Sequence, residues 1–233
     1  MQFSDFITEQ KNTHMTHIED KVLYGGVKGT RDAILALRSL RDMLGGEHEG
    51  KVSVKWDGAP AVFCGTDPRD GEFFVAKKGI FAKSPKVYKS NADIDADTSG
   101  DLNTKLKLAL KHLPELGIKG IIQGDFLYSK SDIKNQKIKG KNYVTFHPNT
   151  IVYAVPRESD AATAIKQSKI GIVWHTTYKG NSFETLKASY GVDVSRFNST
   201  RNVWSQDATL RDLTKPTMSR KDTDEVTNYL STA

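Results

Sequence analysis

The sequence has a single cysteine, Cys64, among its 233 residues. An internal disulfide is therefore excluded, and the absence of a CxxC or HExxH spacing leaves no case for a structural zinc site. The sequence also lacks any apolar run of about 18 residues or more, the length that a membrane-spanning helix requires. No charged segment at the N-terminus is followed by an apolar one. We therefore expect neither a membrane span nor a secretory signal.

The composition is that of an ordinary globular protein, with 37% apolar and 9% aromatic residues. The chain is long enough for one large or two small domains with a hydrophobic core. Its formal net charge is +6, although 28 acidic residues are interspersed among 34 basic ones. This surplus fits contact with phosphate or nucleic acid, and it fits equally a charge that serves only solubility.

Hydrophobic periodicity predicts an α+β fold, built on antiparallel sheet with helices inserted between strand meanders. We expect strands at residues 52–56, 61–64, 72–76, 118–128, 143–146, 150–155 and 170–178. We expect helices at residues 30–44, 102–113, 161–167 and 221–230, and a helical patch at 183–188. The glycine-rich stretch 23–30 is expected to be a loop that Thr30 connects to its helix as the N-cap.

One stretch, residues 52–63, places a lysine and a carboxylate inside an otherwise apolar, β-branched run. In a strand, the side chains of Lys55 and Asp57 point the same way, and Gly58 lets the backbone turn or a ligand approach closely. Burying an ammonium group costs several kcal/mol unless the group is paired or loses its proton. Lys55 is therefore expected to bind a ligand or to take part in chemistry, unless it forms only a structural salt bridge with Asp57.

Lys55-x-Asp57-Gly58, followed by an apolar strand with Gly124-Asp125, resembles the nucleotidyltransferase domain of ATP-dependent polynucleotide ligases and mRNA capping enzymes. In that family the motif lysine attacks the α-phosphate of ATP and forms a lysyl-adenylate, while magnesium orients the leaving pyrophosphate. The resemblance implies an antiparallel, ATP-grasp-like ligase adenylation fold, with ATP and Mg²⁺ as cofactors and DNA or RNA ends as substrates. It makes Lys55 the catalytic nucleophile.

The resemblance also implies roles for other side chains. Asp125 would contact the ribose or a metal-bound water, which makes it the candidate metal ligand, and Tyr153 would stack on adenine. Lys77 and Lys78 would supply the cations that lower the lysine pKa and hold the triphosphate. The full nucleotide-binding set is Val54, Asp57, Gly58, Lys77, Lys78, Asp125 and Tyr153.

Three departures from the ligase motifs favour a different function. Pro60 stands where DNA ligases usually have arginine, and the strand at 170–173 has isoleucine where the metal-binding glutamate belongs. A Lys-x-Lys strand is not found after residue 179. These departures fit a protein that keeps the fold and binds nucleotide or nucleic acid without catalysis. In the strand expected at 170–178, alternation places either Trp174 or His175 in the core, and we expect Trp174 to be the buried one.

The stretches 55–61, 114–120, 123–125 and 171–178 resemble a family of uncharacterised T-even-like phage proteins, many of them from cyanophages. The N-terminal Phe-rich residues likewise resemble the capsid-targeting peptide of internal head proteins, which the phage prohead protease would cleave after Glu9. The resemblance implies location in the phage capsid interior or the host cytoplasm. The expected domains are a targeting-like peptide at 1–10, a nucleotidyltransferase-like domain at 11–180 and a C-terminal helical extension at 181–233. For the fourth and fifth ligase motifs two alternatives stay open, truncation and degeneration.

Overall fold

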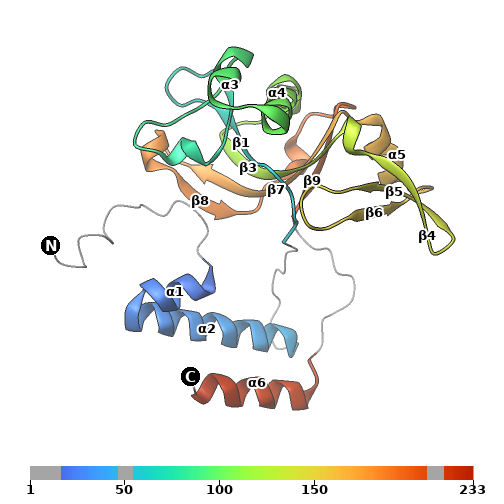
Figure 1. The fold of residues 1–233 in the computed structure, drawn as a ribbon. Helices are drawn as coiled ribbons and strands as arrows, with labels where there is room; N and C mark the ends of the chain where they lie inside the picture. Colours follow the sequence, from blue (N-terminus) through green and yellow to red (C-terminus); the bar gives the residue numbers. More distant parts are fainter. Residues whose placement is uncertain (1–16, 47–54, 209–217, 233) are drawn as a thin grey trace. The chain divides into compact units, whose positions relative to one another are not determined.

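The computed structural model describes residues 17–46, 55–208 and 218–232, and these divide into two units. The smaller unit contains helices α1 (Ile18–Tyr24), α2 (Gly26–Leu44) and α6 (Arg220–Thr232). The larger unit, residues 55–208, contains two sheets and the remaining helices (Figure 1). The expected α+β class with antiparallel sheets is confirmed.

Among the described residues, the main sheet of the larger unit has six strands. They are β1 (Ala61–Thr66), β2 (Phe73–Ala76), β3 (Ile121–Ser129), β7 (Ile170–Lys179), β8 (Lys187–Tyr190) and β9 (Val203–Asp207). The order is β2-β1-β3-β7-β8, with antiparallel neighbours, and β9 runs parallel to β7. Strands β8 and β9 pair with two successive parts of β7. Strand β9 pairs with residues 170–174, and β8 pairs with residues 176–179.

The second sheet has the order β4-β5-β6, with β4 (Lys134–Ile138), β5 (Lys141–Phe146) and β6 (Tyr153–Pro156). Helix α5 (Asp160–Gln167) buries Ala162 and Ile165 in the core cluster that also contains Val144 and Phe146. Strand β4 has no buried residue, and the β4–β5 hairpin extends from the edge of the unit (Figure 1). Because no apolar alternation marks β4, it was absent from the sequence prediction.

Helices α3 (Asn91–Asp97) and α4 (Gly100–His112) cover one face of the main sheet (Figure 1). Leu106 and Ala109 of α4 pack with Val62, Cys64 and other side chains of that face. Cys64 is fully buried, and this burial raises the pKa of its thiol. The helix ends before Pro114, as its sequence predicts.

The opposite face of the main sheet carries two apolar clusters with polar side chains between them. Alternation along β3 places Ile121, Gln123, Asp125 and Leu127 on this face. Ile121 belongs to a cluster with Phe63, Phe74 and Tyr178, whereas Leu127 belongs to the cluster that covers the second sheet. Gln123 and Asp125 therefore lie between the clusters, at a polar interruption of an otherwise apolar surface.

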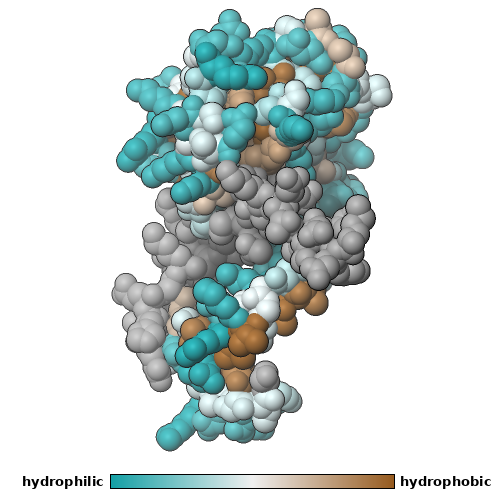
Figure 2. Space-filling model, turned by 90° about the vertical axis from the view of Figure 1, so that its left-hand side faces the viewer, coloured by the Kyte–Doolittle hydropathy of each residue, from teal (hydrophilic) through white to brown (hydrophobic). Residues whose placement is uncertain are grey.

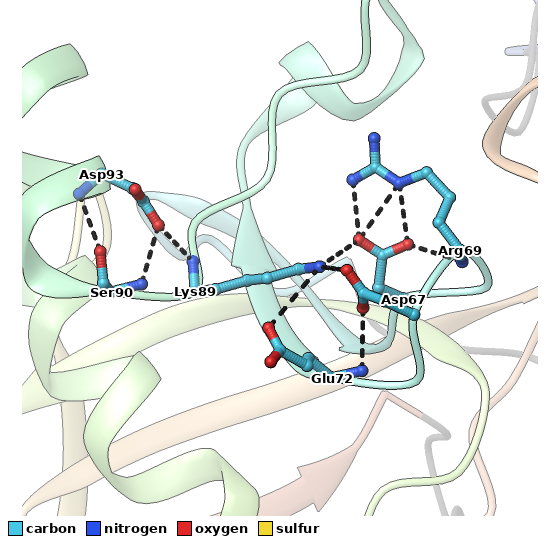
Figure 3. A network of polar contacts seen from close by, with 7 residues as sticks. Asp67, Arg69, Glu72, Lys89, Ser90 and Asp93 are labelled. Carbon is cyan, nitrogen blue, oxygen red and sulfur yellow. Dashed lines mark hydrogen bonds and ion pairs between the residues drawn. The ribbon is translucent and has the colours of Figure 1, made fainter.

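A charged cluster fixes the turn between β1 and β2 (Figure 3). The carboxylate of Asp67 is fully buried and accepts hydrogen bonds from the Arg69 guanidinium, with Nη2 at 2.7 Å, and the backbone N–H of Arg69 at 2.9 Å. The Lys89 ammonium lies 2.8 Å from the same carboxylate and also pairs with Asp70. Hydrogen bonds from Arg69 and Lys89 hold the pKa of Asp67 well below its usual range.

The smaller unit exposes many apolar side chains, which gather on its surface in Figure 2. Leu23, Tyr24 and Val27 are among them. Helix α2 begins at Gly26, so the expected loop with Thr30 as N-cap is wrong, whereas its end before Gly45 was predicted. No helix within the described ranges has both the length and the apolar character needed to cross a membrane.

The sequence placed the end of the main domain at residue 180, and the structure places it later. The expected helical patch at 183–188 is a 3-10 turn (Phe183–Thr185) followed by β8, and β9 was not expected. Both strands pair with β7, so residues up to 208 belong to the larger unit and only α6 is helical beyond it within the described residues. The expected targeting-like peptide at 1–10 lies outside the described residues.

Candidate functional site

The segment from Lys55 to Pro60 enters the main sheet without forming a regular strand. The expected strand at 52–56 is therefore wrong at Lys55 and Trp56, while Val54 lies outside the described residues. The segment instead runs beside β3, because Ala59 N–H donates to Phe126 O at 2.9 Å and Phe126 N–H donates to Pro60 O at 2.9 Å. The Lys-x-Asp-Gly residues thus lead directly onto the strand that carries Asp125.

Gly58 lies against Asp125. A Cβ atom built on Gly58 would lie 2.5 Å from the Asp125 Cβ and 3.1 Å from the Phe126 carbonyl oxygen. Real Cβ atoms do not approach one another so closely, so only glycine permits this contact. The two sequence elements that carried the ligase resemblance, Asp57-Gly58 and Gly124-Asp125, are therefore neighbours in the fold.

Asp57 connects this segment to the loop between β5 and β6. Its carboxylate accepts hydrogen bonds from the side chain of Asn149 at 2.8 Å, from the backbone N–H of Thr150 at 2.6 Å and from that of Ile151 at 2.8 Å. These hydrogen bonds, the Asn149 one first, lower the pKa of Asp57. Three donors occupy the carboxylate, and it forms no salt bridge with Lys55 within the described part of the chain.

Tyr153 is held in the same junction. Its ring stacks on Trp56, with centroids 5.2 Å apart, and on Phe146, with centroids 5.3 Å apart. Its hydroxyl oxygen accepts the Asp57 backbone N–H at 2.7 Å. The expectation that Tyr153 stacks on adenine therefore conflicts with the structure, because its ring already stacks on two protein rings and anchors the junction between the sheets.

His175 approaches Asp125 from β7. Its Nε2 lies 3.8 Å from Oδ1 of Asp125, and the two side chains are 24% and 20% exposed, so solvent reaches both. The register between β3 and β7 skips His175, which also lies between the residues that pair with β9 and with β8. This irregularity directs the imidazole onto the polar part of the face. Trp174 is fully buried, as expected.

Gln123 adjoins this pair along β3. It is buried, and its side-chain oxygen accepts a hydrogen bond from the Tyr178 hydroxyl at 2.7 Å. Burial raises the Tyr178 pKa, so the phenol remains a donor near neutral pH. The Gln123–Tyr178 pair closes one side of the polar interruption, and Asp125 and His175 are its solvent-accessible members.

Of the two cations that the sequence assigned to the site, one is engaged within the fold. Lys77 forms an ion pair with Asp97, with Nζ 3.0 Å from Oδ2, and also lies over the Tyr88 ring, so α3 and not a ligand engages it. Lys55 and Lys78 are exposed, and neither forms an ion pair or side-chain hydrogen bond to any residue that the structure describes.

Lys105 is the cation that contacts the Lys55–Pro60 segment, and the sequence prediction missed it. Its side chain is only 12% exposed, and its Nζ donates to the Ala59 carbonyl oxygen at 3.4 Å and pairs with Asp101 at 2.9 Å. Lys105 follows Leu102 by three residues and precedes Ala109 by four, which places it on the apolar face of α4. A lysine on the apolar face of a helix was the feature of the sequence that could have indicated an ammonium group engaged within the fold.

The fit of magnesium depends on Asp125. No group of three or more His, Cys, Asp or Glu side chains in the described ranges is arranged to hold a metal ion. Magnesium at a nucleotide site is commonly held by one or two carboxylates together with substrate phosphates and water. A single accessible carboxylate such as Asp125 fits that mode of binding, in which the nucleotide supplies most of the ligands.

Together, the fold and the site define an α+β protein in which an exposed lysine, with no ion pair to any described residue, precedes the main sheet, while Gly58 of the same segment contacts a carboxylate on the central strand. The chain matches the family model DUF6267, a family of unknown function, over residues 12–233, and it belongs to that family. No curated protein and no solved structure is significantly similar to it.

Proposed function

We propose that the protein is an ATP-dependent nucleotidyltransferase of the polynucleotide ligase type, with Lys55 as the nucleophile. The observation that carries the proposal is the contact of Gly58 with Asp125, which joins the two separated motifs in one place. A second support is the freedom of the Lys55 ammonium from any described ionic partner, since a nucleophile must be available to its substrate.

In the proposed reaction, the neutral Lys55 amine attacks the α-phosphorus of ATP. The P–N bond forms as the bond from the α-phosphorus to the bridging oxygen breaks, pyrophosphate leaves, and the amine loses its proton to solvent. Magnesium would neutralise the phosphates and orient the pyrophosphate. Asp125 would hold a magnesium-bound water or the ribose, and His175 would be its neighbour. A 5′-phosphate oxygen of DNA or RNA would then attack the adenylyl phosphorus, forming a P–O bond as the P–N bond breaks and the Lys55 amine, reprotonated from solvent, leaves.

The test is covalent labelling of the full chain with ATP carrying a labelled α-phosphate and magnesium. We expect acid-labile label on the protein, located at Lys55 by peptide mass spectrometry and abolished in Lys55→Ala. Lys187→Ala is the matched control, because Lys187 is an exposed lysine of β8 remote in sequence from the motifs. Its labelling should equal that of the unmodified protein. Parallel reactions with labelled GTP, CTP and UTP identify the base.

Absence of label from correctly folded protein with all four nucleotides would refute the proposal. Label that survives Lys55→Ala would refute the assignment of the nucleophile. Asp125→Asn should also lose most of the label, while keeping the thermal unfolding midpoint close to that of the unmodified protein, since asparagine keeps the Cβ that packs against Gly58 and the 3.8 Å contact with His175 is the one ion pair of the Asp125 carboxylate among the described residues.

A second candidate function is a packaged internal head protein that binds nucleotide or nucleic acid without catalysis. The stacking of Tyr153 on Trp56 and Phe146 favours it, because no equivalent base platform is left at that position. The absence of a carboxylate from β7 favours it too. This function predicts binding that persists in Lys55→Ala without any labelling. Cleavage by a prohead protease after Glu9 belongs to this candidate and lies outside the described residues.

A further inference from the structure

The β4–β5 hairpin carries a concentration of positive charge that the fold does not neutralise. Residues 133–143 contain four lysines and no acidic residue. All four lysines are exposed, and none forms an ion pair or a side-chain hydrogen bond with any residue in the described ranges. They are Lys134, Lys137, Lys139 and Lys141. By contrast, Lys77, Lys86, Lys89, Lys105 and Lys107 of the same unit are all paired with carboxylates.

The lysines point away from the hairpin in several directions. The register pairs Lys134 with Thr145 and Ile138 with Lys141, so Lys134 and Lys141 share one face. Lys137 pairs with Asn142 on the other face, and Lys139 lies in the turn. A two-stranded ribbon with cations on both faces and at its tip fits an insertion between two rows of anionic groups.

The turn retains a lysine in a conformation that disfavours it. Lys139 has φ 46° and Gly140 has φ 82°, as in a type I′ hairpin turn. Lys139 is the only non-glycine residue with positive φ in the described ranges. Asparagine is the residue commonly found at this position, because its side chain tolerates the left-handed conformation. A lysine held there at a conformational cost is a second, independent indication that the tip charge is used.

We propose that the β4–β5 hairpin inserts into the major groove of double-stranded DNA and that its lysines contact the phosphates on both sides. The pairing of β5 with β6 begins at Tyr143, so the outer part of the hairpin is two-stranded and projects by about 10 Å. The major groove of B-DNA is about 12 Å wide and 8.5 Å deep and admits a two-stranded β-ribbon. Asn135, Gln136 and Asn142 supply hydrogen-bonding side chains between the lysines.

DNA fits this surface better than a membrane or double-stranded RNA does. A membrane-inserting tip needs large apolar side chains, and here Ile138 is the one exposed large apolar residue of the two strands. The major groove of A-form RNA is too narrow for side chains to enter. The hairpin proposal rests on the proposed function only in taking a nucleic acid as the partner. It involves no residue of the Lys55 site, so the labelling experiment and the DNA-binding experiment fail separately.

The test compares two variants of the full chain that remove the same charge. The first changes the four hairpin lysines to glutamine. The second, a matched control, changes four exposed lysines of the larger unit that also have no described partner: Lys83, Lys111, Lys119 and Lys187. Binding to a fluorescent DNA duplex is measured by anisotropy at several salt concentrations, with duplex RNA and single-stranded DNA in parallel.

We expect the hairpin variant to bind duplex DNA at least about tenfold more weakly at low salt, and the slope of its salt dependence to fall by about 0.9 for each phosphate that it no longer neutralises. The control variant should retain most of the affinity, and duplex RNA should bind more weakly than duplex DNA. Equal weakening in both variants would overturn the proposal, because net charge alone would then explain binding. Equal binding of duplex RNA would overturn insertion into the DNA major groove.

Lysines on an edge strand can instead serve to prevent strands of two molecules from pairing. If that were their role, the hairpin variant would form aggregates in light scattering while its monomer kept the original DNA affinity, and the proposal would be wrong. Lys139→Asn provides a milder variant that preserves the turn. It should weaken duplex binding a few-fold and lower the slope of the salt dependence by about 0.9. Unchanged binding in Lys139→Asn would show that the lysine at the tip of the hairpin does not contact the DNA.

Discussion

The charged cluster at Asp67 and the β4–β5 hairpin are both charged turns of the larger unit, but they differ in where their charges go. At Asp67, a buried carboxylate is surrounded by Arg69 and Lys89 (Figure 3). Lys89 also pairs with Asp70. In the hairpin, Lys137 and Lys139 extend into solvent without a described partner. In the Asp67 cluster the charges are paired with one another within the fold. In the hairpin the lysine charges remain available to a ligand.

This difference also explains why sequence composition was ambiguous. The net charge of +6 is compatible with solubility or with nucleic-acid binding. Once internal pairs are subtracted, the unpaired lysines of the larger unit are not spread evenly, because four of them fall within one hairpin. The location of unpaired charge is thus more informative than its total, and substitutions in the two turns should have different effects.

The largest effect is expected from removing the centre of the paired cluster. Asp67→Ala would leave the Lys89 ammonium, which is 20% exposed, without its closest buried partner and would release the Arg69 guanidinium. We expect the free energy of unfolding of the larger unit to fall by about 2–3 kcal/mol, because breaking a buried ion pair is strongly destabilising. Chemical denaturation followed by tryptophan fluorescence measures this loss.

Asp70→Ala is the control for that measurement. Asp70 also pairs with Lys89, but its side chain is 47% exposed, so its removal should destabilise the unit much less. Equal destabilisation by the two substitutions would show that the contribution of the cluster to the free energy of unfolding does not depend on the burial of Asp67.

A smaller effect is expected from acid. The pKa of Asp67 is lowered by hydrogen bonds from Arg69 and Lys89, and that of Asp97 by hydrogen bonds from Lys86, Tyr88 and Lys77. A carboxylate whose folded pKa is depressed contributes stability that is fully present above its unfolded pKa, near 3.8, and is lost as the pH falls below that value. The free energy of unfolding should therefore decrease progressively as the pH is lowered from about 5 to about 3.

The same titration in Asp67→Ala sharpens this prediction. The variant starts from lower stability, and its further destabilisation in acid should be smaller, since one carboxylate with a strongly depressed pKa is gone. An acid profile parallel to that of the unmodified protein would assign the acid sensitivity to other groups.

The strands and helices with regular apolar periodicity were predictable from sequence. Residues 61–64, 143–146 and 170–178 fall within observed strands, and 102–113 overlaps α4 closely. The elements that were missed lack such periodicity. Strand β4 has five exposed residues, and β9 pairs with β7 although it buries only Val203 deeply. Backbone pairing with a neighbouring strand, β5 for β4 and β7 for β9, forms these two strands, and the apolar pattern of their own residues does not reveal it.

The candidate site was predictable in part. The sequence indicated that Gly58 would let the backbone turn or a ligand approach closely, and in the structure Asp125 of the chain itself lies against it. It could not show that three donors of the 149–151 loop would occupy Asp57, or that Tyr153 would stack between protein rings, because both depend on how the second sheet packs. It also assigned the cations to Lys77 and Lys78, whereas Asp97 pairs with Lys77 and Lys105 contacts the segment.

The smallest expected effect has the opposite sign to that at Asp67. Lys139→Asn should raise the free energy of unfolding by about 0.5 kcal/mol, because asparagine adopts positive φ at lower cost than lysine does. Lys137→Asn is the control, since Lys137 lies in a strand, where asparagine is disfavoured, and it should be neutral or slightly destabilising. Chemical denaturation of both variants checks the difference, and a Lys139→Asn protein less stable than Lys137→Asn would contradict it. A substitution that stabilises the fold while weakening DNA binding would show that the tip lysine is retained for its charge and not for the turn.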